Sequence, residues 1–252
     1  MGAVILAGVW AGAINTLVGS GTLVTFPLLL ALGTPAVTAN VSNSIGLVAG
    51  GVSGTIGYLP ELKGMGRRVL QLVPMSVLGA VLGALLLLRL PARAFEAVVP
   101  VLIGLGIVLV VAGPRLQAWS RARHEEGTKM PTGHLVALMA GVLFAGIYGG
   151  YFGAAQGVIL IGLLSALSTE PLQSLNGLKN VLGTIVNIVG SITFLITAPD
   201  LIDWRIAGLV AVGAVAGGVL GARYGRRLPP NALRAVIVVV GLAGLVKFVF
   251  FP

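Results

Sequence analysis

Leu17-Val-Gly-Ser-Gly-Thr22 interrupts an apolar stretch, residues 1–60, that contains no charged side chain. Such a stretch is long enough for two or three passes of a hydrocarbon core about 30 Å thick, at about 20 residues a pass. Over the whole chain of 252 residues, 57% are hydrophobic and only 9% are charged, against about 25% in soluble proteins. The sequence therefore predicts an integral membrane protein and excludes a soluble domain.

Solid apolar blocks fill most of the remaining sequence, as at residues 69–88 and 206–222. A membrane barrel would instead alternate apolar and polar residues over segments of about 10. Turn signals at Gly33-Thr-Pro35 and Thr169-Glu-Pro171 divide the longest blocks. We expect an all-α integral membrane protein with eight apolar segments.

The two halves of the chain resemble each other. Gly79-Ala-Val-Leu-Gly-Ala84 recurs as Gly217-Gly-Val-Leu-Gly-Ala222. Polar positions repeat as well, since Asn40 and Ser44 align with Asn176 and Asn180. Self-similarity of this kind predicts an internal duplication.

The duplication predicts a first transmembrane repeat over 1–112, a linker over 113–134 and a second repeat over 135–252. Each repeat would begin with a Gly-broken hairpin, 2–32 or 135–167, and continue with three transmembrane helices. Internal repeats with a binding site at their interface are the common plan of secondary transporters.

Basic residues lie in the links between the blocks and bear on topology. If every segment crosses the membrane, nine of them fall inside and six outside; if both hairpins are re-entrant, eleven fall inside and four outside. The positive-inside rule favours the second count, so the repeats are predicted to be inverted, with the linker in the cytoplasm. Since topology accounts for the net charge of +9, no nucleic-acid partner is expected.

The hairpins break at Leu17–Thr22 and Gly149–Gly157, where Gly lets the backbone turn inside the bilayer. A helix that restarts after a break presents free N–H groups and a positive dipole end, which bind anions. Close helix packing is the other explanation for Gly in membrane helices, but two breaks in matching positions favour a binding role. The anion-binding residues predicted here are Gly19, Ser20, Gly21, Thr22, Gly153, Gln156 and Gly157.

Polar side chains also occupy the helix that follows each break. Lys179 is the only charge well inside a predicted span, where a charge costs at least about 2.5 to 3.5 kcal/mol, so an anionic ligand would suit it. Snorkelling to the interface is the alternative for Lys179, and hydrogen bonds between helices, worth about 0.6 kcal/mol, are the alternative for a single Asn. The binding residues predicted in this group are Asn40, Asn43, Ser44, Asn176, Lys179 and Asn180.

The sequence lacks the residues that several classes of function require. All seven carboxylates lie at loops or segment ends, which argues against an intramembrane proton relay and against a cation permease. With no Cys and both His in the linker, we expect no metal site, no cofactor and no enzyme activity. The chain has no phosphate-binding loop to power pumping. The membrane potential, about 2.3 kcal/mol per charge per 100 mV, or substrate protonation would drive an anion outward.

The chain resembles the TauE/SafE sulfite exporters of the TSUP permease superfamily over nearly its whole length. The resemblance rests on Ala11 to Leu30, Leu32-Gly-Thr-Pro35, Ala39-Asn-Val-Ser-Asn-Ser44, Gly146 to Gly157 and Leu175-Asn-Gly-Leu-Lys-Asn180. It implies outward transport of sulfite, sulfonates or related organosulfur anions. The break at Gly19-Ser-Gly21 has less Gly than is usual in the family, and a chain without Cys departs from the thiosulfate-importing relatives.

We therefore expect a multi-pass permease of a bacterial or archaeal plasma membrane that exports sulfite or a short organosulfonate, bound centrally at the repeat interface. Its expected partners are this small anion and the lipid bilayer. Small-residue faces at Gly79, Gly83, Gly217 and Gly221 would pack within the chain or form a homodimer. Two alternatives stay open: a permease for another small anion in either direction, and a non-transporting scaffold in which Gly and Asn serve only packing.

Overall fold

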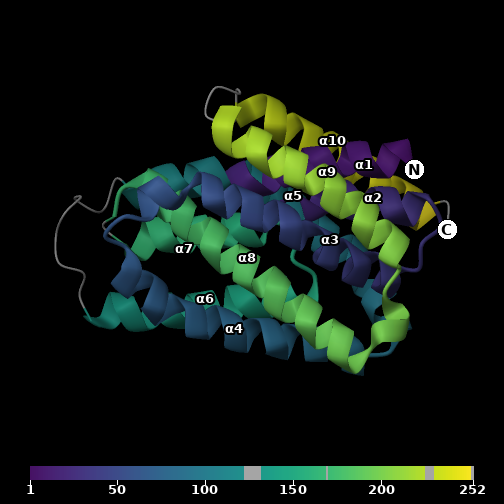
Figure 1. Ribbon diagram of the computed structural model, residues 1–252, viewed down its shortest axis with the longest axis horizontal. Helices are drawn as coiled ribbons and strands as arrows, with labels where there is room; N and C mark the ends of the chain where they lie inside the picture. Colours follow the sequence, from purple (N-terminus) through teal and green to yellow (C-terminus); the bar gives the residue numbers. More distant parts are fainter. Residues whose placement is uncertain (122–131, 169, 225–229, 251–252) are drawn as a thin grey trace.

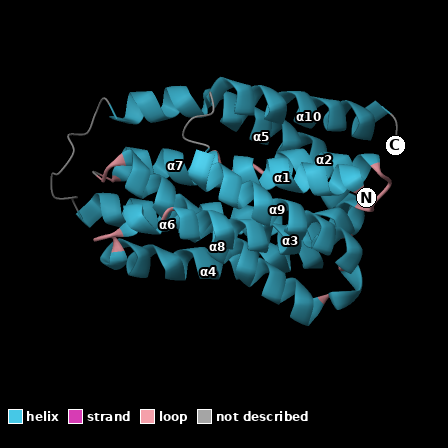
Figure 2. Cartoon of the chain, turned by 45° about the horizontal axis from the view of Figure 1, so that its top comes forward, coloured by secondary structure: helices cyan, strands magenta, loops and turns pink. Residues whose placement is uncertain are grey.

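The structure, a computed structural model, describes residues 1–121, 132–168, 170–224 and 230–250, and Figures 1 and 2 show a bundle of helices without a strand in these ranges. The all-α prediction is confirmed for this part of the chain. The helices are α1 (Gly2–Leu17), α2 (Thr22–Ala31), α3 (Ala36–Gly57), α4 (Gly66–Arg89), α5 (Ala92–Arg121), α6 (Thr132–Tyr151), α7 (Gln156–Leu167), α8 (Leu172–Thr197), α9 (Trp204–Tyr224) and α10 (Pro230–Phe250), with 3₁₀ turns η1 (Leu59–Leu62) and η2 (Pro199–Leu201).

The outside of the bundle is apolar. Among the described residues, five helical stretches are long and apolar enough to cross a membrane: Gly66–Arg89, Ala92–Arg115, Gly133–Tyr151, Leu172–Thr197 and Trp204–Tyr224. Large apolar side chains project from them, such as Leu70, Phe144 and Ile196, which are 77%, 70% and 74% exposed. Soluble proteins rarely expose so much apolar surface, so the bundle is suited to lipid, as expected of a multi-pass membrane protein.

Both expected breaks are present, between α1 and α2 and between α6 and α7. Gly19 and Gly153, which align in the two halves, have positive φ values of 81° and 76°. Glycine adopts this backbone conformation readily because it has no Cβ. The breaks, 18–21 and 152–155, are shorter than the sequence predicted, because helix resumes at Thr22 and Gln156.

The predicted linker is partly helical. Helix α5 continues through Pro114 to Arg121, and α6 already begins at Thr132. The residues that follow Pro114, Arg-Leu-Gln-Ala, are good helix formers and extend the helix beyond the apolar block. The rest of the predicted linker, 122–131, lies outside the described residues.

Each hairpin packs against helices of the other half. Helix α1 lies on α9 and α6 lies on α4, while α2 contacts α10 and α7 contacts α5. Each contact has a counterpart in the other half: α1–α9 corresponds to α6–α4, and α2–α10 corresponds to α7–α5. Figure 1 shows α1 beside α9 at the top of the view and α6 beside α4 at the bottom.

Helices α3 and α8 lie against each other and run in opposite directions. Near the start of α3, Ser42 Oγ accepts a hydrogen bond of 2.8 Å from Asp203 N–H, just beyond the end of α8. The end of α3 leads into η1, which contacts α8 near its start. Between these points Thr55 Oγ1 and Thr184 Oγ1 are 3.1 Å apart.

Glycines bring the backbones of α1 and α9, and those of α4 and α6, into contact. A Cβ on Gly217 would overlap the carbonyl oxygen of Val9, and one on Gly83 would overlap that of Ile147. Close approach through small residues is how membrane helices pack. All four glycines of the predicted small-residue faces pack inside the chain, Gly79 and Gly83 on α6 and Gly217 and Gly221 on α1.

We expect Gly217→Ala to lower the stability of the protein by about 1–3 kcal/mol, because the methyl group would push α9 away from α1. Gly208, on the same helix, is the matched control, since a Cβ there would have no neighbour within 4 Å. Unfolding in detergent micelles measures both variants. A loss of stability in Gly208→Ala as large as in Gly217→Ala would contradict the backbone contact.

Candidate functional site

The tips of the two hairpins meet. Gly157 N–H donates a hydrogen bond of 2.9 Å to Gly19 O. A Cβ on either glycine would overlap the Cα atom of the other. Helix α1 therefore ends, and α2 and α7 begin, around a single point of backbone contact.

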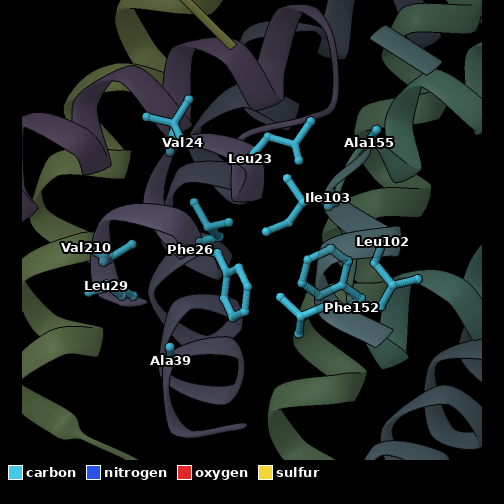
Figure 3. Packing of buried hydrophobic residues seen from close by; sticks show 14 of the residues in the cluster. Leu23, Val24, Phe26, Leu29, Ala39, Leu102, Ile103, Phe152, Ala155 and Val210 are labelled. Atoms are coloured by element: carbon cyan, nitrogen blue, oxygen red, sulfur yellow. The ribbon is translucent and has the colours of Figure 1, made fainter. Parts of the chain in front are cut away.

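Aromatic rings close one side of this contact. The Phe152 ring, in the second break, lies 5.0 Å from that of Phe26 on α2 and 6.0 Å from that of Phe95 on α5, in edge-to-face geometry. All three side chains are fully buried. Figure 3 shows Phe26 and Phe152 facing each other among other apolar side chains, so this side of the tips is packed and apolar.

A small polar cavity lies at the tips. Its volume of ≈ 20 Å³ is room for about one water molecule. Leu47 is the only large apolar side chain in its wall, and none of the lining residues is acidic. The lining residues are Asn15, Thr16, Gly19, Thr22, Leu47, Gly51, Gly153, Gln156, Gly157, Lys179, Asn180, Gly183, Thr184 and Asn187.

Seven of the residues predicted to bind the anion line this cavity: Gly19, Thr22, Gly153, Gln156, Gly157, Lys179 and Asn180. They come from both breaks, from the starts of α2 and α7, and from α8. One predicted donor is already engaged, because the Gly157 N–H is hydrogen-bonded to Gly19 O. The hairpin tips and α8 thus come together as the sequence predicted, with fewer free backbone donors.

The other predicted residues lie outside the cavity wall. Asn43 Nδ2 donates to Thr22 Oγ1 at 3.4 Å, and Asn40 Nδ2 donates to Tyr151 O at 2.9 Å, where α6 ends. Ser44 Oγ donates to the carbonyl of Asn40 on its own helix. The wall also leaves out Ser20, Gly21 and Asn176. The α3 polar group thus supports the hairpin tips rather than lining the cavity.

Lys179 is buried, with 2% of its surface exposed, and does not snorkel to an interface. Its Nζ donates a hydrogen bond of 3.0 Å to Thr16 O. Thr16 is in the last turn of α1, where carbonyls lack helical partners and the dipole is negative, which suits an ammonium group. Thr16 O accepts one of the three N–H bonds of the ammonium, and the lining contributes no carboxylate to balance its charge.

Two further donors in the cavity wall have no partner among the residues that the structure describes. They are the side-chain amide nitrogens of Gln156 and Asn180, which are buried and make no hydrogen bond. A buried donor without an acceptor costs about 1–3 kcal/mol. Together with Lys179 they form a set of N–H donors that an anion rich in oxygen would satisfy. Among the described residues no cluster of His, Cys, Asp or Glu could hold a metal ion.

Sequence reasoning did not select half of the cavity wall. It left out Asn15 and Thr16, which precede the first break, and Leu47, Gly51, Gly183, Thr184 and Asn187 on α3 and α8. The repeat offers a signal for four of these, because the Asn40–Asn176 alignment continues to Leu47–Gly183 and Gly51–Asn187. All four line the cavity.

Comparisons with known proteins agree on one family. The family described as "Sulfite exporter TauE/SafE" matches residues 4–248. The "Probable membrane transporter protein YfcA" of Escherichia coli (strain K12) is 27% identical over 266 residues, covering 99% of this chain and 90% of the relative. A "Probable membrane transporter protein" of Haemophilus influenzae is 24% identical, covering 96% and 92%. No solved structure matches the chain. The chain belongs to the TauE/SafE sulfite exporter family of membrane transporters.

Proposed function

We propose that this protein is a permease that exports sulfite or a short organosulfonate, bound in the central cavity. The observation that carries the proposal is the buried ammonium of Lys179 in a wall without acidic residues. The unpaired amide groups of Gln156 and Asn180 add donors at the same place. An oxyanion would supply both the missing negative charge and the missing acceptors. The family supports sulfur oxyanions as the substrate class.

The halves support an arrangement of inverted repeats in a bacterial or archaeal plasma membrane. Helices α3 and α8 are antiparallel, and Figure 1 draws the start of α1 and the end of α5 at opposite ends of the bundle. With the η1 end of α3 in the cytoplasm, Lys63, Arg67 and Arg68 lie inside, as the positive-inside rule prefers. Membrane potential or substrate protonation would then drive an anion outward.

Transport through this site requires motion. A cavity with room for about one water molecule is too small for sulfite, so the hairpins and α8 must separate to admit it. Each hairpin packs on the fourth helix of the other half, α9 or α4, which makes movement of one packed unit against the other a natural route to alternating access. The Gly19–Gly157 contact is the point where the two units meet.

Two other functions are alternatives to this proposal, and the experiments below distinguish them from it. A permease for another small anion, in either direction, would use the same donors. A non-transporting scaffold would use the Lys179–Thr16 hydrogen bond only to hold the end of α1. What favours a permease over the scaffold is the cavity itself, because packing alone leaves no use for unpaired donors that face an open space.

We expect Gly157→Ala to reduce anion flux strongly, because its Cβ would overlap Gly19 Cα and separate the hairpin tips. Gly162→Ala, on the same helix with no neighbour within 4 Å of the new Cβ, is expected to keep wild-type flux. Both variants are compared in sealed proteoliposomes. Wild-type flux in folded Gly157→Ala protein would remove the tip contact from the mechanism.

We expect Lys179→Gln to lower sulfite flux at least about tenfold, since a hydrogen bond to a charged group contributes about 1.5–3 kcal/mol and tenfold corresponds to 1.4 kcal/mol. Glutamine can still donate a hydrogen bond but carries no charge. Uptake of sulfite and methanesulfonate into proteoliposomes is measured with inside-positive and with zero potential. Lys63→Gln, the same change at an exposed residue, is the control.

The thermal unfolding of each variant in detergent separates loss of transport from loss of the fold. Wild-type flux in Lys179→Gln protein would exclude Lys179 from the site. Folded wild-type protein that moves other small anions but neither sulfur anion would leave the permease and replace the substrate. Folded wild-type protein that moves no small anion would support the scaffold.

A further inference from the structure

The two halves contribute equivalent but different residues to the wall of the cavity. Leu47 of α3 and Gly183 of α8 occupy matching positions in the repeat, and both line the cavity. Leu47 is buried, with 1% of its surface exposed, and it is the large apolar side chain among the lining residues. A Cβ on Gly183 would have no neighbour within 4 Å, so the matching side is open.

This difference makes Leu47 the apolar part of a wall that is otherwise polar or glycine. Helix α8 contributes Lys179, Asn180, Thr184 and Asn187, and Gln156 adds an amide from the start of α7. Helix α3 contributes only Leu47 and Gly51. An anion whose oxygens meet the donors of α7 and α8 therefore presents its remaining substituent to Leu47.

The substituent that faces Leu47 distinguishes the sulfur anions. Sulfite has three oxygens and a lone pair on a pyramidal sulfur, whereas a sulfonate has carbon in the place of the lone pair and sulfate has a fourth oxygen. Carbon would need the volume that Leu47 occupies. A fourth oxygen would face an apolar side chain without a donor, and sites discriminate strongly against polar groups that they leave unpaired. The lone pair needs no donor and takes less space than a carbon or an oxygen atom.

We infer that Leu47 and Gly183 are specificity-determining residues, which restrict the site to sulfite and exclude alkyl sulfonates and sulfate. The inference rests on the proposed function and narrows it, because it selects one of the two substrates proposed there. Gly183 leaves room beside the donors of α8, which the oxygens use once the hairpins and α8 have separated. Leu47 limits what the fourth position on sulfur can carry.

The test of Leu47 is the ratio of methanesulfonate flux to sulfite flux in proteoliposomes, at one pH and one imposed potential. We expect Leu47→Ala to raise this ratio at least about tenfold, because the pocket then accepts a methyl group. Leu29→Ala is the matched control, since Leu29 is also 1% exposed but lies on α2 outside the cavity wall. It removes the same atoms and is expected to leave the ratio unchanged.

The test of Gly183 is the flux of sulfite itself. We expect Gly183→Ala to lower sulfite flux about tenfold, because its methyl group enters the open side of the cavity. Leu47→Ala in the same chain is expected to restore part of that flux by returning volume to the cavity. Gly208→Ala, whose Cβ is equally free of neighbours but lies on α9, is the control.

The outcomes separate the two proposals. Sulfite flux in folded Leu47→Ala protein with an unchanged ratio overturns the size filter and leaves the proposed function intact. Rapid methanesulfonate or sulfate flux in wild-type protein also overturns the filter alone. Absence of flux of all three anions in folded wild-type protein overturns the proposed function and this inference with it. If Leu47→Ala does not fold, the ratio in Leu47→Val and the rescue of Gly183→Ala by that variant decide.

Discussion

The arrangement of the helices around the cavity depends on the hydrogen bond from Gly157 N–H to Gly19 O. It places two helix breaks against each other in the interior of an apolar bundle, where backbone groups outside helices need partners. Helix α1 ends at this depth, and the carbonyl of Thr16 in its last turn needs a donor. Lys179 supplies one from α8. Lys179 therefore also satisfies a carbonyl that the end of α1 leaves without a helical partner. The same break accounts for the course of the backbone and for the charge in the candidate site.

The two halves of the chain pair their helices in matching ways but carry unequal side chains, and this difference determines the charge of the cavity wall. Asn43 and Lys179 hold equivalent positions on α3 and α8. Asn43 donates to the hydroxyl of Thr22 at the start of α2, whereas Lys179 donates to a carbonyl in the last turn of α1. The first is a neutral contact between neighbouring elements, and the second brings a positive charge to the cavity. A nearly symmetric scaffold therefore holds a site with one charged side.

The sequence predicts the parts of this structure that depend on local chemistry. Two Gly-rich interruptions in charge-free blocks indicate the breaks, and a lone Lys179 inside a span marks the cavity. Asn15 and Thr16 could not be selected, because only the packing of α1 against α3 and α8 brings them to the cavity and no sequence period encodes that packing. Asn40 was predicted to bind the anion, but the end of α6 lies next to it and Tyr151 O takes its amide.

The exchange of hairpins between the halves also bears on how the chain is made. During synthesis α6 emerges after α4, so the second hairpin finds its partner helix already in the membrane. The first hairpin has no such partner until α9 (Trp204–Tyr224) emerges, late in translation. Until then the small-residue face of α1 must be sheltered by lipid or by the insertion machinery. The hairpin that is translated first is therefore the last to pack against its partner helix.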